Sequence, residues 1–467
     1  MKAVSLLILY LLFCSINFTT AQLKSKVDER FELTSIVFRL ADAPEYVNNE
    51  IPTYTNAIDN YFKQYKKHEL ILFIKEIREK HGISYDAVTI AASCLHIKNG
   101  KITIKPGFDI SRISELDSRW TASTFQLFVN QLNRFYKETK FNHFYSQHKD
   151  LYNTATDRLD ELLKQIDYHW FKSYFGSDLE EASVIASLSN GPSNYAFSTP
   201  PKNGIVIGCA TDEKGLPLYN KNMILVIVHE LLHHYTNPLI FKYKEQMDSS
   251  ALKIYSYSKE DMNKLAYGDA HIAISEWFTN LFSILYFQEN PGLGLSFSVD
   301  HLIRESHNQG FIWMERSMIF MQHFLDNRNQ YSLIEDFIPQ IIGFLNLTAE
   351  NFEQVQHEYN NRRPYVVDFF PIPGSTVTPD ITTIKIRFSE PMLEANGIKA
   401  MDDENILIFP YFEMPFWQDK YTFVIPLDKT KLINGKTYGG QLIRDFFQSD
   451  KTYAMQKDYI YFFSISE

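Results

Sequence analysis

The stretch MILVIVHELLHHYTNP at residues 223–238 constrains the fold more than any other part of the chain. Six apolar residues run directly into His229, Glu230 and His233, so two imidazoles and a carboxylate stand on a segment that favours burial. In a helix, residues four apart lie about 40° apart around the axis, one turn above each other. His229 and His233 can then bind one metal ion, with Glu230 to one side of the pair. The alternative is an amphipathic helix that only carries histidines on its surface.

A catalytic zinc ion needs three protein ligands and one open position, so the two histidines require a third partner. We predict Glu276, which follows His233 by 43 residues within the helical pattern HIAISEWFTNLFSILYF. A carboxylate buried in an apolar helix is costly without a cation. Asp269 and His271 are the alternative ligands, and Glu276 could instead lie exposed on the helix flank. The side chain of His234 points about 100° away from that of His233, so we expect it outside the ligand set.

His229, Glu230 and His233, followed by the helix-borne Glu276, resemble the gluzincin branch of zinc metallopeptidases, the thermolysin-like group. The resemblance implies that His229, His233 and Glu276 hold Zn²⁺. It also implies that Glu230 acts as general base on the water that attacks a peptide bond. The expected activity is that of a zinc metalloendopeptidase, a hydrolase that cleaves a peptide or protein substrate.

The same resemblance implies further catalytic residues. Tyr267 resembles the tyrosine found between the metal ligands of thermolysin-like enzymes, and His307 resembles their downstream histidine; either would stabilise the oxyanion. Asn280 stands where many gluzincins carry an acidic residue that orients the first histidine. Its amide oxygen can still accept an imidazole N–H, but it supplies less charge, so this sequence departs from the family pattern.

Upstream of the histidines, residues 183–210 contain short β-favouring runs separated by Asn, Gly and Pro. In gluzincins an edge strand, and then a strand ending in glycine, precede the H-E-x-x-H helix; SNYAFS and GIVIGCA stand in those places here. The free backbone groups of an edge strand can pair with an extended peptide. The resemblance therefore assigns substrate binding to Asn194, Tyr195, Ala196 and Phe197, whereas an ordinary sheet edge is the alternative.

The patterning predicts an α+β fold, with a mainly helical region that contains a small mixed sheet, followed by an all-β sandwich. Resemblance to known families implies that the first is a zincin-like catalytic region and the second an Ig-like sandwich. Asn99-Gly100 between alternating apolar residues predicts a β-hairpin in the mainly helical N-terminal third. The expected parts are a signal peptide (1–21), a helical N-terminal region (22–175), a zincin-like catalytic domain (176–360) and the Ig-like β-sandwich (361–467).

The last part begins after the polar, Pro-rich linker NNRRPYVVDFFPIPGSTVTPD, where helical patterning gives way to short alternating segments. PIPGSTVTPDITTIKIRFSEPM resembles bacterial Ig-like domains that follow catalytic modules, and Tyr438 suits the tyrosine-corner position of such sandwiches. We expect the sandwich to be a spacer or attachment module. The whole chain after the signal also resembles a secreted bacterial family known only as a domain of unknown function.

The first residues, MKAVSLLILYLLFCSINFTTAQ, combine Lys2, an apolar stretch and small residues near Ala21. This pattern is typical of a signal peptide cleaved after Ala21, which implies a secreted or periplasmic protein; a membrane anchor is the alternative. No later segment is apolar enough to be an integral membrane span. The two remaining cysteines, Cys94 and Cys209, permit one disulfide in an oxidising compartment, and the sequence does not decide their pairing.

The net charge of the chain and the candidate metal site narrow the range of possible functions. The net charge of −10 and the absence of a long basic run argue against nucleic acid as a partner. Two other functions stay open: a zincin-scaffold protein that binds a cell-surface or extracellular polymer, and an amidase that acts on a glycan or cell-wall strand. Glu230 favours an enzyme, because a structural zinc site needs no base. The sequence predicts neither the oligomeric state nor whether the N-terminal region is a removable pro-segment.

Overall fold

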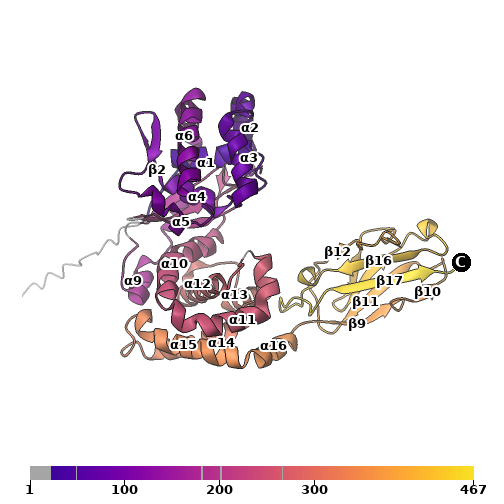
Figure 1. The fold of residues 1–467 in the computed structure, drawn as a ribbon. Helices are drawn as coiled ribbons and strands as arrows, with labels where there is room; N and C mark the ends of the chain where they lie inside the picture. The colour runs from indigo at the N-terminus through magenta and orange to yellow at the C-terminus, as the bar shows by residue number, and fades with distance from the viewer. Residues whose placement is uncertain (1–22, 49, 180–181, 200–201, 266) are drawn as a thin grey trace, which may run out of the picture. The chain divides into compact units, whose positions relative to one another are not determined.

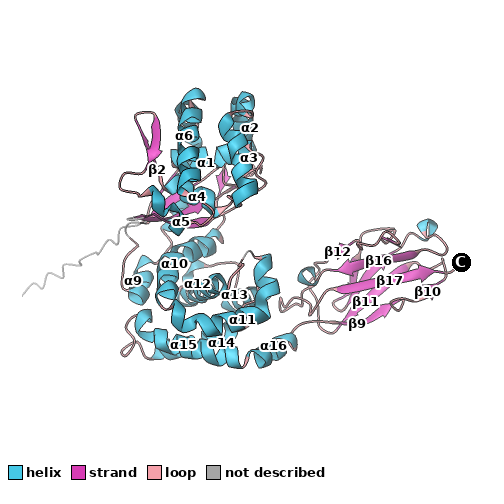
Figure 2. Cartoon of the chain, viewed as in Figure 1, coloured by secondary structure: helices cyan, strands magenta, loops and turns pink. Residues whose placement is uncertain are grey.

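The computed structural model describes residues 23–48, 50–179, 182–199, 202–265 and 267–467 (Figure 1). The predicted signal peptide at residues 1–21 lies outside these ranges. The chain divides into two compact units, Met1–His234 and Tyr235–Glu467. Helices, with one small mixed sheet, make up most of the chain up to residue 360, and strands dominate after it (Figure 2). The predicted α+β class is confirmed.

Most of the first unit is helical, and each helix presents an apolar face to its neighbours. Its aromatic side chains pack edge to face or stacked, as Phe62 does with Phe135, Phe141 and Phe144. The helices are α1 (Glu29–Leu40), α2 (Pro52–Phe62), α3 (Glu69–His81), α4 (Asp86–Ser93), α5 (Ile113–Leu116), α6 (Ala122–Glu138), α7 (Phe141–Gln147), α8 (Lys149–Leu163) and α9 (Tyr168–Phe175). The predicted hairpin is confirmed as β2 (Leu95–Lys98) and β3 (Lys101–Ile104).

A four-stranded mixed sheet in the order β1-β4-β6-β5 lies in the same unit. Strands β1 (Ser25–Lys26), β4 (Ser183–Ala186) and β6 (Lys202–Ile207) run parallel, whereas β5 (Tyr195–Thr199) is antiparallel to β6. Strand β5 ends the order, so the run predicted at SNYAFS does form an edge strand. Besides the β2–β3 hairpin, another two-stranded sheet joins β7 (Ala210–Thr211) to β8 (Pro217–Leu218).

The sheet packs against α1 and α4 through an apolar cluster. Gly204 is required here, because a Cβ atom at this position would lie 2.2 Å from Cζ of the Phe197 ring. The cluster comprises Phe31, Ala92, Ile185, Phe197 and Val206. Since Phe31 and Ala92 come from the helical segment, that segment and the sheet share one core.

A buried carboxylate strengthens this attachment. Glu32 on α1 is fully buried and accepts hydrogen bonds from the Ser187 hydroxyl (2.7 Å), the Leu188 N–H (2.9 Å) and the Tyr54 hydroxyl (2.8 Å). Burial raises the pKa of Glu32, and these donors oppose that rise. Residues from before position 175 thus complete the sheet and fix the loop that leads to β5. Removing the N-terminal region as a pro-segment would expose this core.

The second unit begins within helix α10 (Met223–Lys242), which continues unbroken through the boundary. Helix α11 packs against α12 and α15, and α12 packs against α13 and α14. Their bounds are α11 (Lys244–Lys264), α12 (Ala270–Glu289), α13 (Val299–Asn308), α14 (Met314–Asp326), α15 (Ile334–Glu350) and α16 (Phe352–Asn360). The centre of this packing is Trp277, whose indole N–H donates to the Ser317 hydroxyl (3.0 Å) while its ring contacts Trp313.

The C-terminal strands form two sheets around a single apolar core, which makes a β-sandwich. One sheet has the order β14-β15-β11-β9, and the other β10-β17-β16-β12 with β13 beside β16. Most pairs are antiparallel, whereas β10 with β17 and β13 with β16 are parallel. The strands are β9 (Val366–Phe370), β10 (Thr376–Val377), β11 (Thr383–Phe388), β12 (Ile398–Lys399), β13 (Ile406–Leu407), β14 (Phe416–Asp419), β15 (Thr422–Pro426), β16 (Thr437–Leu442) and β17 (Tyr459–Ile465).

Tyr438 has the geometry expected of a tyrosine corner. Its hydroxyl accepts a hydrogen bond from the Ile433 N–H (2.9 Å) and donates one to the Lys431 carbonyl (3.2 Å). The ring itself is buried in the sandwich core. The side chain therefore fixes the turn that precedes β16, as the sequence predicted.

Within the second unit, the loop before β17 is hydrogen-bonded to the helices. Arg363, which follows α16 and is 7% exposed, donates to the carbonyl oxygens of Ala454 (2.9 Å) and Met455. The Asn308 amide at the end of α13 donates to the Thr452 carbonyl (2.9 Å) and accepts from the Ala454 N–H (3.2 Å). The loop before β17 is thus hydrogen-bonded directly to the helices.

No helix in the ranges that the structure describes has both the length and the hydropathy needed to cross a membrane.

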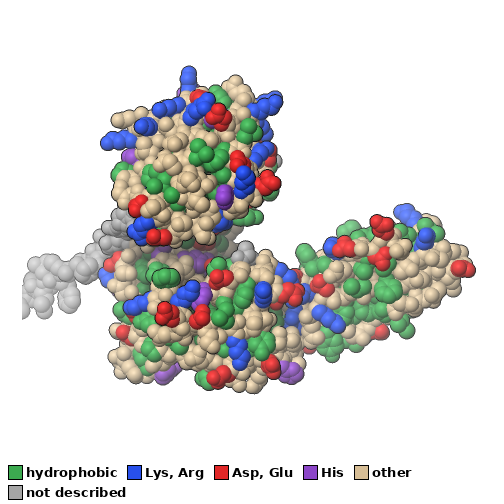
Figure 3. Space-filling view, in the orientation of Figure 1, with side chains coloured by type: hydrophobic (Ala, Val, Ile, Leu, Met, Phe, Trp, Pro, Cys, Tyr) green, Lys and Arg blue, Asp and Glu red, His purple; other side chains and the backbone are tan. Residues whose placement is uncertain are grey.

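On the face shown in Figure 3, lysine and arginine side chains are interspersed with aspartate and glutamate.

Two arginines of different burial allow a controlled test of the loop contact. Arg363→Ala leaves two buried carbonyl oxygens without their donor, so it should lower the free energy of unfolding by about 2 to 4 kcal/mol. Arg316→Ala removes a largely exposed ion pair with Glu358 on α16 and should cost less than about 1 kcal/mol. Urea denaturation measures both. Equal, small losses would mean that the loop does not hold the sandwich.

Candidate metal centre

Helix α10 forms because its apolar residues recur every three or four positions. Ile224, Ile227, Val228, Leu231 and Leu232 are completely buried, which fixes the helix against the protein interior. His229, Glu230 and His233 lie between these positions and are all partly exposed. The buried stripe therefore determines which way the histidine pair faces.

Three side chains converge at this point. Nε2 of His229 lies 3.1 Å from Nε2 of His233, and the two rings are nearly perpendicular, at 88°. One carboxylate oxygen of Glu276, on α12, completes a group whose ligand atoms all lie within 4.8 Å of one another. All three side chains are partly buried. The structure thus brings together the predicted ligand set in a cluster that could hold a metal ion.

The donor set fits a small metal ion. Two nitrogens bound tetrahedrally at about 2.0 to 2.1 Å would stand about 3.3 Å apart, close to the observed 3.1 Å. The same separation also fits a hydrogen bond between the two imidazoles. A cation would be bound by all three groups at once, because their ligand atoms all lie within 4.8 Å of one another.

The alternative ligands have other partners. The Asp269 carboxylate caps α12, accepting from the N–H groups of His271 (2.8 Å) and Ile272 (3.0 Å). Nε2 of His271 lies 2.9 Å from a carboxylate oxygen of Asp248. Neither residue belongs to the cluster. Of the candidates from the sequence, Glu276 alone joins the two histidines.

A hydrogen bond between buried hydroxyls holds the two ligand-bearing helices together. Oγ1 of Thr236, on α10, lies 2.7 Å from Oγ1 of Thr279, on α12, and both residues are completely buried. Each threonine lies three residues after a ligand, His233 on one helix and Glu276 on the other. The hydroxyl pair therefore lies within one helical turn of the metal cluster.

Two other residues of the motif remain outside the ligand cluster. Glu230 is partly buried, and its carboxylate is not among the converging atoms. His234 also lies outside, as predicted, with its Nε2 buried and lacking a hydrogen-bond partner in the described structure. Burial lowers the pKa of His234 to about 4, so this imidazole is neutral at pH 7.

His307 is a buried side chain of the second unit. The side chain is buried between the rings of Tyr359 and Tyr453, and its Nε2 accepts a hydrogen bond from the Glu315 N–H (3.4 Å). Burial lowers the pKa of His307 to about 4. Its contacts are with α16, the start of α14 and the sandwich loop, and its role as an oxyanion donor stays a prediction.

Tyr267 precedes α12, and Asn280 lies on it. Tyr267 lies in the link between α11 and α12, partly buried, with its ring 6.1 Å from that of Phe311. Asn280 is partly exposed on α12, and in the described part of the chain no hydrogen bond joins its amide to either imidazole. Their roles in catalysis remain predictions.

The proposed substrate strand is built from one buried and several partly exposed side chains. Phe197 belongs to the sheet core, so only its backbone can face a ligand. Asn194 precedes β5, and its side-chain oxygen accepts a hydrogen bond from the Gly208 N–H (3.0 Å). Tyr195 and Ala196 are partly exposed. Within the described residues, the outer side of β5 carries no paired strand.

The two cysteines are separate free thiols, so the disulfide that the sequence permitted is not formed. Both are buried, which raises the pKa of Cys94 to about 11 and that of Cys209 to about 12. At neutral pH both thiols are protonated and poorly nucleophilic.

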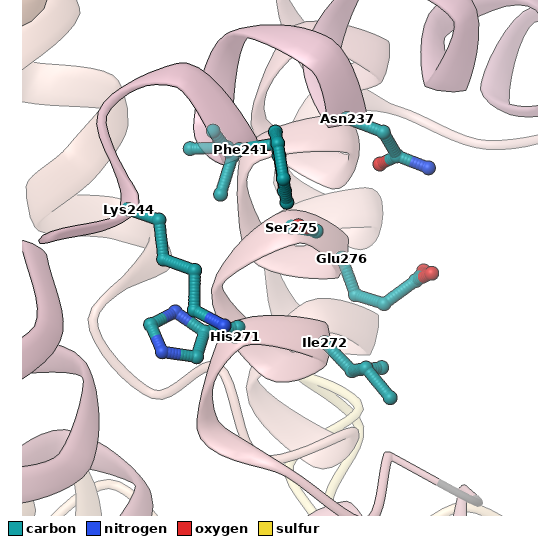
Figure 4. A pocket seen from close by; sticks show the side chains of 8 residues that line it. Asn237, Phe241, Lys244, His271, Ile272, Ser275 and Glu276 are labelled. Carbon is teal, nitrogen blue, oxygen red and sulfur yellow. The ribbon is translucent and has the colours of Figure 1, made fainter. Parts of the chain in front are cut away.

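Sequence reasoning missed a pocket beside the cluster, although a signal for it exists. Asn237 and Phe241 continue the four-residue spacing of His229 and His233 along α10, and both line the pocket together with Glu276 (Figure 4). The same spacing rule that predicted the ligand pair therefore indicates which residues follow it on that face.

A family model described as a domain of unknown function (DUF4932) matches residues 23–344. The match includes both histidines, Glu230 and Glu276, and ends before the sandwich begins. No curated protein and no solved structure matches the chain.

Metal affinity tests the ligand assignment. Glu276→Ala removes one of three protein ligands and should weaken metal binding by at least ~100-fold. His271→Ala, on the same helix, is the matched control and should leave the affinity unchanged. Competition with a chromogenic chelator measures both. Release of metal by the His271 variant with retention by the Glu276 variant would reverse the assignment.

Proposed function

The chain belongs to the family of the domain of unknown function DUF4932, and we propose that it is a secreted zinc-dependent metalloendopeptidase. The observation that carries the proposal is the convergence of His229, His233 and Glu276 while Glu230, next to the first histidine, stays outside the ligand set. Three protein ligands leave a coordination position for water or substrate. The adjacent carboxylate supplies the base that hydrolysis requires.

Glu230, which follows the ligand His229 in sequence, is the reason for choosing zinc over other metals. Two histidines and one carboxylate also suit Fe(II) in oxygenases, which need open positions for oxygen chemistry. A carboxylate adjacent in sequence to a ligand, yet outside the ligand group, favours hydrolysis, because that reaction must accept and return a proton. The i, i+4 histidine pair with an intervening Glu is also the arrangement typical of zinc metalloproteases.

Zinc, when bound, would polarise the substrate carbonyl and lower the pKa of the attacking water. His229 and His233 hold their nitrogens in place because the helix between them is rigid and its apolar face is buried. The Glu230 carboxylate takes a proton from the water and returns it to the leaving amide nitrogen. Tyr267 or His307 would donate a hydrogen bond to the oxyanion, an effect worth about 3 to 4 kcal/mol at other enzymes.

The edge strand favours a polypeptide substrate over a glycan strand. Strand β5 offers main-chain donors and acceptors along its outer side, and an extended peptide can pair with them regardless of its side chains. An amide in a cell-wall strand lacks this regular backbone. Hydrolysis of cell-wall amides and binding without hydrolysis remain the two alternatives, and the tests below separate them.

Glu230→Gln tests the catalytic role. The substitution keeps the side chain's volume and removes its ability to accept a proton, so zinc content should survive while peptide hydrolysis falls by at least ~100-fold. Turnover of a mixed peptide library and metal analysis of the same sample give the two readouts. A wild-type protein as inert as the variant on peptides and on cell-wall amides, yet tightly bound to a polymer, would support the binding-scaffold alternative.

Secretion is tested by the mature N-terminus. Protein recovered from outside the cytoplasm of a bacterium that produces the full chain should begin at Gln22, because the sequence favours cleavage after Ala21. Protein sequencing reads this directly. A chain that retains Met1 and stays in the cytoplasm would contradict this part of the proposal.

A further inference from the structure

A pocket of about 320 Å³ lies in the second unit beside the metal cluster, and Glu276 lines it (Figure 4). Its walls come from the last turns of α10 and the first turns of α12. The volume is near the lower end of the range for ligand pockets, about 300 to 1,000 Å³. It therefore suits one or two side chains of a larger ligand.

The pocket continues the face that carries the metal ligands. Asn237 and Phe241 follow His233 at spacings of four and eight residues on α10, whereas Ile272 precedes Glu276 by four residues on α12. The two helices run in opposite directions at this contact, because later residues of α10 face earlier residues of α12. A peptide held at the cluster can thus reach the pocket with a neighbouring side chain.

Large apolar side chains form its walls. Ile240 is buried, but Phe241 is 77% exposed and Ile272 is 46% exposed. Single exposed apolar residues are common on protein surfaces, but two that line one concave site next to a cluster of metal-ligating groups favour ligand binding. They favour an apolar group on the ligand, because contact would remove both side chains from water.

The pocket also has one unpaired cation. Lys244, the first residue of α11, is exposed and makes no ion pair in the described structure. His271 beside it is paired with Asp248. In Figure 4, Lys244 and His271 lie on one side of Phe241 and the Glu276 carboxylate lies on the other. An anionic group on the ligand would complement Lys244, at the end of the pocket away from the metal cluster.

Building on the proposed peptidase function, we propose that this pocket selects the substrate. It receives a large apolar side chain near the scissile bond, and Lys244 pairs with an acidic group that follows. Substrates of this class are peptides in which a leucine- or phenylalanine-like residue is followed by aspartate or glutamate.

Affinity in the absence of turnover tests the selection. The zinc-loaded Glu230→Gln protein is titrated with labelled peptides that differ only at two positions, phenylalanine or serine, then glutamate or lysine. Fluorescence anisotropy should give the tightest binding for the phenylalanine–glutamate peptide. Adding Lys244→Glu should weaken the binding of the phenylalanine–glutamate peptide about tenfold relative to the binding of the phenylalanine–lysine peptide, because the ion pair becomes a repulsion. Adding Phe241→Ala with Ile272→Ala should reduce the phenylalanine preference about tenfold.

Matched controls lie on the neighbouring helix α11. Lys253→Glu changes the same charge away from the pocket, and Leu252→Ala removes an exposed apolar side chain there. Neither should alter the preferences. The pocket substitutions alter exposed side chains, and Lys244→Glu places a carboxylate at a helix N-terminus, where it is favourable. Folding should therefore be preserved.

The outcomes separate this proposal from the peptidase proposal. If the peptide preferences are lost only in the pocket variants and the wild-type protein cleaves no peptide, the proposed role of the pocket is supported and the peptidase proposal is wrong. If cleavage depends on Glu230 but the peptide preferences do not change when Lys244, Phe241 and Ile272 are substituted, the peptidase proposal is supported and the proposed role of the pocket is wrong. A Glu230→Gln protein that binds no peptide at all would also overturn it.

Discussion

The approach of helices α10 and α12 is the constraint on which the candidate site depends. His229 and His233 are positioned by their own helix, but Glu276 reaches them only because the second helix packs at the correct distance and rotation. The buried hydroxyl pair of Thr236 and Thr279 sets that contact one turn from the ligands.

The remaining architecture supports this contact from both sides. Completely buried apolar residues hold α10 against the interior, and the Trp277 packing centre holds α12 against α14. In the first unit, the buried Glu32 ties the N-terminal helices to the sheet and its edge strand. In the second, Arg363 ties the sandwich loop to the helices. Segments that the sequence pattern suggests are separate are therefore joined by hydrogen bonds that involve buried groups.

Local spacing explains which features the sequence could predict. The histidine pair, the Asn99-Gly100 hairpin and the Tyr438 corner each depend on residues a few positions apart, where backbone geometry alone fixes the relation. Glu276 could be predicted because an apolar helix gives a carboxylate few alternatives to a cation. The edge position of β5 followed from a family resemblance and proved consistent with the strand order.

Features that depend on tertiary contacts could not be predicted. His307 has the sequence position of a catalytic histidine, but a neighbouring helix and the sandwich loop bury it. The third-ligand alternatives at Asp269 and His271 were resolved only by their capping and ion-pair partners. The pocket required residues from three helices, and no local pattern specifies the antiparallel contact between α10 and α12. The free state of Cys94 and Cys209 likewise depends on how distant segments fold.

We propose that two imidazoles and one carboxylate bind a zinc ion, and X-ray absorption spectroscopy of the purified protein tests this binding directly. The absorption edge identifies the metal, and the fine structure gives its ligands. We expect zinc with two imidazole nitrogens at about 2.0 to 2.1 Å and oxygen ligands at about 2.0 to 2.2 Å, without sulfur. Iron at the edge, sulfur among the ligands, or a single imidazole would contradict it.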